Sequence, residues 1–84
     1  MKLTSLSNKK LLINRLTRAE GQLRAIREMI LADEDCVNIA TQLSAVRSAV
    51  NQTLGAFATC AIEEVNNSKK STEKDISGII KLVM

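Results

Sequence analysis

The sequence predicts an all-α protein, because its 84 residues contain no proline, only three glycines and a single aromatic side chain, Phe57. Sheets and barrels normally use more aromatic and turn-forming residues than this. With 45% hydrophobic and 25% charged residues, the chain has enough apolar side chains to fold. A lone chain this short buries little surface, so we expect one small domain, residues 1–84, that forms an oligomer.

The sequence also predicts a cytoplasmic protein without a membrane partner. No apolar run approaches the ~20 residues of a membrane span, and the N-terminus lacks the apolar segment of a signal peptide. In that compartment the two cysteines, Cys36 and Cys60, are expected to be free thiols.

The first predicted helix carries an apolar seam whose members recur at alternating steps of four and three residues, a spacing that fits one helix face. Ser7 is the predicted N-cap. The acidic cluster that follows suits the start of a second helix, where carboxylates meet the positive end of the helix dipole. The seam comprises Leu12, Leu16, Ala19, Leu23, Ile26 and Ile30, and the cluster comprises Asp33, Glu34 and Asp35.

The second helix is predicted to run from about Asp35 to about Glu64, a length of roughly 45 Å. Its seam is too long for one short companion helix to cover. We therefore expect it to pair antiparallel with the same helix of a second chain, about a two-fold axis near Arg47 and Ser48. The seam comprises Ile39, Leu43, Val46, Val50, Leu54, Phe57, Ala61 and Val65.

The second helix is expected to end at Asn66-Asn67-Ser68, and a third to follow from about Thr72. The third helix is expected to turn four apolar side chains inward, namely Ile76, Ile79, Ile80 and Val83.

Positive charge is concentrated at the start of the chain, where residues 1–27 carry seven basic side chains and one acidic one. At 100° per residue, Arg15, Arg18 and Gln22 fall on one side of the first helix. This stripe predicts a surface for a polyanion. Histidine and tyrosine are absent, and the glycines are too scattered to form a phosphate loop, so we expect no enzyme activity.

The two cysteines stand near opposite ends of the second helix, about 36 Å apart along its axis. They cannot meet within one chain. In the antiparallel pair, Cys36 of one chain lies level with Cys60 of the other, although their directions differ by about 120° around the helix. The alternative is that both are small apolar residues with a structural role.

Three strings of this sequence resemble the CsoR/RcnR/FrmR family of small all-helical bacterial repressors, which sense copper, nickel or cobalt, formaldehyde, or reactive sulfur. They are NRLTRAEGQL at 14–23, DCV at 35–37 and QLSAVRSAV at 42–50, and the resemblance covers roughly residues 8–66. It implies a three-helix protomer with a long central helix, an antiparallel dimer and a disc-like tetramer made of two dimers. It also implies binding of operator DNA through basic residues of the first helix, here Arg15 and Arg18, with Lys9 and Lys10 nearby.

The resemblance further implies that Cys36 is the sensor cysteine, which binds metal or reacts with an inducer. The family's other metal ligands fall on Ala61 and Val65 here, and Cys60 stands one residue before the first of them. We therefore expect no nickel, cobalt or zinc site and no bound cofactor. Copper(I) bound by two thiolates remains an alternative, and it needs Cys60 of the partner chain beside Cys36.

The reactive-sulfur sensors have a second cysteine where this chain has Val65, and the formaldehyde sensors combine the first cysteine with an amine. Here that amine would be supplied by Met1 or Lys2. The resulting hypothesis is a DNA-binding transcriptional repressor that leaves its operator when a small-molecule inducer, formaldehyde or another thiol-reactive species such as reactive sulfur, modifies Cys36. The alternatives are a copper(I)-responsive repressor that uses Cys36 and the partner's Cys60, and a helical adaptor that does not bind DNA.

Overall fold

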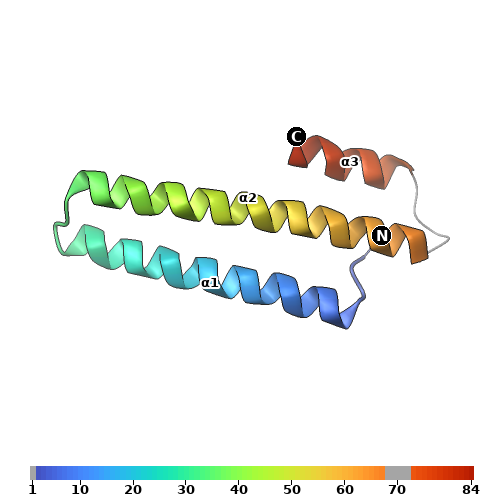
Figure 1. Cartoon of the computed structure of the whole chain (residues 1–84), viewed down its shortest axis with the longest axis horizontal. Helices are drawn as coiled ribbons and strands as arrows, with labels where there is room; N and C mark the ends of the chain where they lie inside the picture. Colours follow the sequence, from blue (N-terminus) through green and yellow to red (C-terminus); the bar gives the residue numbers. More distant parts are fainter. Residues whose placement is uncertain (1, 68–72) are drawn as a thin grey trace.

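The computed structural model describes residues 2–67 and 73–84, and all regular structure in these residues is helical (Figure 1). Helix α1 spans Leu6–Leu31, α2 spans Cys36–Asn67 and α3 spans Glu73–Val83. α1 and α2 form an antiparallel hairpin, while α3 contacts the C-terminal part of α2 on the side away from α1. The predicted all-α class with a long central helix is therefore confirmed.

The turn between α1 and α2 closes with two backbone hydrogen bonds around one left-handed residue. The N–H of Asp33 donates to the carbonyl of Ile30 at 3.2 Å, and the N–H of Glu34 donates to the carbonyl of Met29 at 3.0 Å. Asp33 has a φ of 55°, which aspartate tolerates better than most residues with a side chain. This pattern is the Schellman motif, and it reverses the chain within a few residues.

Asp35 caps the N-terminus of α2. Its Oδ2 accepts hydrogen bonds from the N–H groups of Val37 at 3.0 Å and Asn38 at 3.2 Å. A carboxylate there also meets the positive end of the helix dipole. The prediction that the acidic cluster starts the second helix is correct. α2 ends at Asn67, within the predicted boundary Asn66-Asn67-Ser68 and three residues past the approximate end given near Glu64.

Ser5, not Ser7, is the N-cap of α1, and its side chain accepts the N–H of Asn8 at 3.4 Å. The reason lies on α2, where Oε1 of Glu64 accepts the N–H groups of both Thr4 and Ser5 at 2.8 Å. The hydroxyl of Thr4 also donates to Oε2 of Glu64 at 2.8 Å. The predicted cap was wrong because this carboxylate fixes the chain two residues before Ser7.

Only half of the predicted seam of α1 is buried. One row with a spacing of seven residues is 4–6% exposed and packs against α2, whereas the row four residues further on is 49–55% exposed. A single neighbouring helix covers only one flank of the seam, so the other flank stays open. The buried row is Leu12, Ala19 and Ile26, and the open row is Leu16, Leu23 and Ile30.

The predicted seam of α2 also divides, but less simply. Thr53 and Cys60, which were not predicted to belong to it, lie in the buried row, and its members Leu54, Ala61 and Val65 are half-buried or buried outside both rows. Val46 and Cys60 are buried in a row with the half-buried Ile39 and Thr53, and the row four residues further on is 39–47% exposed. A step of four residues turns a helix by about 40°, and in an antiparallel pair this turn points both open rows to the same side. The two rows form what we call the open apolar face, which comprises Leu16, Leu23, Ile30, Leu43, Val50 and Phe57.

Helix α3 covers α2 only partly. Ile76 and Ile79 are half-buried, while Ile80 and Val83 are more than 40% exposed. The prediction that all four side chains face inward is thus wrong for Ile80 and Val83, because α3 contacts only α2 among the described helices. The predicted boundary residues Ser68 and Thr72 lie outside the described residues. No helix in the described part of the chain has the length and apolar character needed to cross a membrane.

The contact between Glu64 and the start of α1 predicts a pH-dependent contribution to stability. Hydrogen bonds from the N–H groups of Thr4 and Ser5, then from the Thr4 hydroxyl, hold the pKa of Glu64 below its ordinary value of 4.5. Because the pKa is lowered in the folded state, this stabilisation is present above pH 4.5 and is lost as the pH falls through the lower, folded-state pKa.

We expect Glu64→Gln to lower the melting temperature at pH 7, and the difference from wild type to shrink steadily below pH 4.5. Thermal unfolding followed by circular dichroism measures both values. Glu20→Gln, which neutralises an exposed glutamate on α1, is the matched control and should change little at either pH. Equal melting temperatures for Glu64→Gln and wild type at pH 7 would contradict the prediction.

Candidate functional site

Cys36 is the first residue of α2, and its side chain is exposed. It borders an open depression of about 500 Å³ that is otherwise lined by Val37, Ala40, Thr41 and Ser44. The cap formed by Asp35 fixes the backbone immediately before it. A small molecule, or another chain, can therefore reach this thiol directly.

Cys60 has the opposite environment, because only 3% of its surface is exposed and it belongs to the row of α2 that packs against α1. Burial raises the pKa of the Cys60 thiol, and the negative charge of Glu63 raises it further. Both effects favour the neutral thiol, which is a weaker nucleophile than the thiolate. Cys60 therefore lies in the core of the hairpin, and its part in sensing stays a prediction.

The described residues bring no set of metal ligands together. Cys36 and Cys60 lie at opposite ends of α2, about 36 Å apart along the helix, so they do not meet within one chain. Ala61 is buried and Val65 is half-buried, which leaves apolar side chains where the resemblance places further ligands. Within residues 2–67 and 73–84, no three His, Cys, Asp or Glu side chains are grouped to hold a metal ion. One chain thus offers a single accessible thiolate ligand.

Arg15, Arg18 and Gln22 come together in a depression of about 130 Å³ between α1 and α2. Gln52 and Thr53 of α2 form its other wall, and we call this depression the arginine groove. Arg18, Gln22 and Gln52 are exposed, whereas Arg15 is half-buried. The Nε atom of Arg15 is buried and has no hydrogen-bond partner among the described residues.

The arginine groove lies on the opposite side of the hairpin from the open apolar face. Arg15 and Gln22 stand four residues before Ala19 and Ile26 of the buried row, whereas the open row stands four residues after it. Arg15 and Gln22 are therefore turned about 40° from the buried row in one direction, and the open row is turned about 40° in the other. On α2, Gln52 stands one residue before Thr53 of the buried row, which turns it about 100° toward the groove side. A partner on the apolar face would leave the groove accessible.

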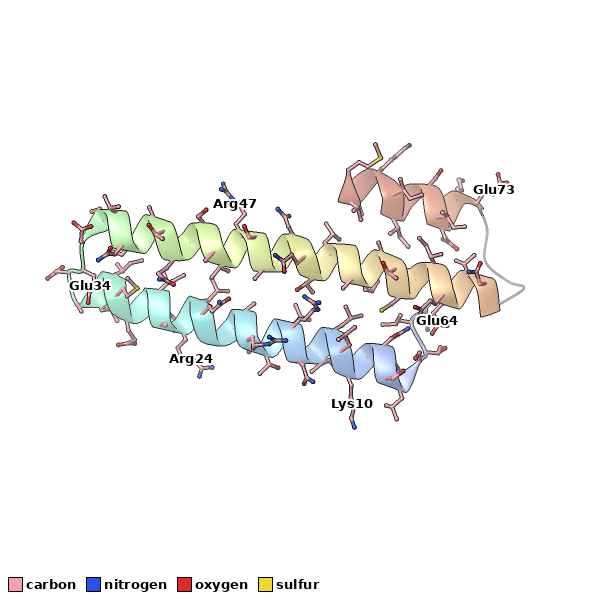
Figure 2. All side chains as sticks on the ribbon, viewed as in Figure 1. Lys10, Arg24, Glu34, Arg47, Glu64 and Glu73 are labelled. Carbon is pink, nitrogen blue, oxygen red and sulfur yellow. The ribbon has the colours of Figure 1, made fainter. Side chains whose placement is uncertain are left out.

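The two predicted lysines do not line this groove. Lys10 points away from α2, as does Arg24 further along α1 (Figure 2). Lys9 is exposed near the start of α1. Its charge helps to lower the pKa of Glu64, so it lies near that carboxylate and not in the groove. The predicted basic set is thus divided between the groove and other exposed parts of α1.

Sequence reasoning missed two residues that shape these surfaces, Gln52 and Glu64. Gln52 becomes a wall of the groove only through the register of α2 on α1, and Glu64 contacts Thr4 across 60 residues of sequence. Gln52 could have been found by aligning the two helices antiparallel on their rows of spacing seven. Arg18 and Gln52 each stand one residue before a member of these rows, so this alignment places them on the same side of the hairpin. No local pattern in the sequence singles out Glu64.

Comparison with known proteins shows that this chain is similar to transcriptional repressors. The model of the metal-sensitive transcriptional repressor family matches residues 8–84. The copper-sensing transcriptional repressor RicR of Mycobacterium tuberculosis is 53% identical over 36 residues, which are 43% of this chain and 38% of that protein. The copper-sensing transcriptional repressor CsoR of Bacillus subtilis is 51% identical over 37 residues, which are 44% of this chain and 37% of that protein.

The matched segment thus spans less than two fifths of each of these two relatives. The family match is much longer, since it extends from the first turn of α1 through α2, with the exposed Cys36, to the last residue of the chain. The chain therefore belongs to the CsoR/RcnR/FrmR family of metal-sensitive transcriptional repressors.

Proposed function

We propose that this protein is a repressor that binds operator DNA through the arginine groove and leaves it when an effector acts on Cys36. The observation that carries the proposal is the placement of an accessible thiol and a cationic groove on one helical hairpin. Both sites use α2, so a displacement of that helix at Cys36 also changes the wall of the groove. Family membership supports the repressor role.

The groove suits a DNA backbone. Contacts to phosphate supply most of the affinity of many DNA-binding proteins, and arginine can bind a phosphate through two parallel hydrogen bonds. Arg18 is exposed, and none of the described residues that line the depression is a carboxylate. Lys9 and Lys10 are also exposed and can add contacts beyond the groove.

We also propose that a second copy of the chain covers the open apolar face. Six large apolar side chains that are 39–55% exposed on one side of a hairpin favour association in water. The open row of α2 is symmetric about Val50, with Leu43 and Phe57 seven residues to either side. An antiparallel pair would therefore have its two-fold axis near Val50, close to the predicted position near Arg47 and Ser48. Pairing of two such dimers would give the disc-like tetramer.

This axis changes the expected neighbour of Cys36. The spacing of seven that defines the open row continues to Cys36 at one end and Glu64 at the other. In the proposed pair, Cys36 of one copy lies level with Glu64 of the other, and so with the Thr4 segment that Glu64 holds. Cys60 faces α1 instead, so a bridge between Cys36 and the partner's Cys60 would require Cys60 to leave the core.

Two effector chemistries follow from this arrangement. Copper(I) is favoured because both curated relatives are named copper-sensing, although one chain provides a single accessible thiolate and a second donor must come from the partner.

A thiol-reactive molecule is the second candidate effector, and the single accessible thiol of Cys36 supports it. Formaldehyde would join the Cys36 sulfur to an amine by a methylene bridge with release of water, and Lys2 is an exposed amine on the segment held by Glu64. Met1 lies outside the described residues.

The DNA surface is tested by single substitutions in the groove. Arg18→Ala and Arg15→Ala should weaken binding to the DNA upstream of the protein's own gene and flatten the salt dependence of log affinity by roughly one unit per lost contact. Arg24→Ala removes the same charge from a side chain that points away from α2, so it should have a smaller effect. Gel-shift titration at several salt concentrations measures this, and equal losses in all three variants would contradict a groove-specific contact.

The assembly is tested by a charge on the open apolar face. Val50→Asp should dissociate the oligomer and lower the helix content, because the buried carboxylate would face its own copy across the axis. Asn51→Asp adds the same charge one residue away on an exposed position and is the control. Sedimentation velocity with circular dichroism gives both readouts. Val50→Asp that sediments like the wild type would show that this face is not the interface.

The sensor is tested at the two cysteines. Cys36→Ser should keep DNA affinity and lose release by copper(I) and by formaldehyde, since serine is a far weaker ligand and nucleophile. Cys60→Ala should retain release but unfold at a lower temperature, because it removes a buried sulfur from the hairpin core.

Intact mass distinguishes the chemistries, since a methylene bridge adds one carbon atom and a metal adds its own mass under non-denaturing conditions. Cys36→Ser protein that is still released from DNA by the same effector would remove Cys36 from the mechanism.

A further inference from the structure

The described side chains that line the arginine groove carry many hydrogen-bond donors and no negative charge. Its lining provides two guanidinium groups, from Arg15 and Arg18, and two side-chain amides, from Gln22 and Gln52. The hydroxyl of Thr53 is already engaged, because it donates to a backbone carbonyl of its own helix at 2.9 Å. The chemistry of this groove therefore calls for a ligand that accepts several hydrogen bonds and carries negative charge.

The Nε atom of Arg15 makes this requirement specific. It is buried, it has no partner among the described residues, and a guanidinium cannot lose its proton to relieve the mismatch. A buried donor without an acceptor is unfavourable, and a ligand oxygen at this point removes that penalty. The groove volume of about 130 Å³ is many times the ~10–15 Å³ that a single water requires, so it can admit an oxyanion.

We infer that the arginine groove is a binding site for one phosphate group, held by Arg15 and Arg18 of α1 and closed from the other side by Gln52 of α2. The phosphate can belong to a DNA backbone, in which case the inference rests on the proposed function, or it can be free inorganic phosphate. Gln52 is the new element, since it gives a neutral residue of α2 a direct part in anion binding. The site is therefore complete only at the observed register of the two helices.

This placement has a consequence for regulation. A ligand that contacts both helices binds best at one register and stabilises that register by the same free energy. A shift of α2 along or around its axis would move Gln52 away from the two arginines and weaken phosphate binding. The affinity of the groove for an anion thus depends on the register of α2 on α1.

Inorganic phosphate, titrated into the full-length protein without DNA at constant ionic strength, tests the site directly. Nitrogen–proton NMR should show a saturable shift of the Arg15 Nε–H signal, whereas sodium chloride at equal ionic strength should not shift it. Gln52→Ala should weaken phosphate binding about tenfold, the size expected for one hydrogen bond to a charged group. Asn51→Ala, one residue away and exposed, is the matched control and should bind like the wild type.

Arg15→Lys refines the test, because it keeps the positive charge and removes the buried Nε–H. It should weaken phosphate binding although the net charge is unchanged. A shift of Arg15 that does not saturate, or an equal loss in Gln52→Ala and Asn51→Ala, would overturn the site. Circular dichroism of each variant shows that the helices remain intact.

A DNA titration then identifies the source of the phosphate. If it is the DNA backbone, Gln52→Ala should lower affinity for upstream DNA without changing the salt slope, because a neutral amide releases no counterion. Normal DNA affinity in a Gln52→Ala protein that has lost phosphate binding would assign the site to free phosphate.

If the wild-type protein binds no DNA, the proposed function fails and the phosphate titration alone decides the site. If it binds DNA, while phosphate leaves the Arg15 signal unchanged and Gln52→Ala retains full DNA affinity, the site is overturned and the repressor role stands.

Discussion

The antiparallel packing of α1 on α2 is the contact on which the other features of this protein depend. It rests on few buried side chains, both large and small, that follow a spacing of seven residues, namely Leu12, Ala19 and Ile26 on α1 with Val46 and Cys60 on α2. Small residues let the two helices approach closely, and the constant spacing fixes one register along the whole hairpin. This register sets which side chains stay exposed in the open apolar face and which face one another across the groove.

Because a hairpin of two helices covers only one flank of each seam, it has two distinct sides. On one side the open apolar face favours a second copy of the chain, and on the other side Arg15 and Arg18 meet Gln52 in a polar groove. The proposed association and the proposed anion binding therefore use different surfaces. The same geometry explains why each apolar seam is wider than one neighbouring helix can bury, since part of each seam has no covering helix within the described chain.

Spacing alone was sufficient to predict the three helices, the acidic start of the second and the grouping of Arg15 with Arg18 and Gln22, because these depend on local periodicity. What could not be predicted depends on contacts between distant parts of the chain. Ser5 replaces Ser7 as the cap of α1 because Glu64 lies beside it, and Gln52 joins the groove through the register of the hairpin. The exposure of Ile80 and Val83 likewise depends on how many helices surround α3, which the periodicity of one helix does not reveal.

The packing of α1 on α2 also gives the two thiols different environments, which bears on the proposed sensing chemistry. Cys60 occupies one of the few positions that hold α1 on α2, so a modification there would disturb the contact that fixes the groove and the open apolar face together. Cys36 lies outside that contact, at the capped end of α2, where an effector can bind without unfolding the hairpin. It is still joined to Gln52 by about 24 Å of continuous helix. A regular helix moves largely as one body, so in the proposed mechanism a small rotation of α2 at Cys36 would reach Gln52 and change its position relative to Arg15 and Arg18. A sensor thiol needs to be accessible to the effector and connected to the groove through rigid structure. Cys36 meets both requirements, whereas the buried Cys60 meets only the second.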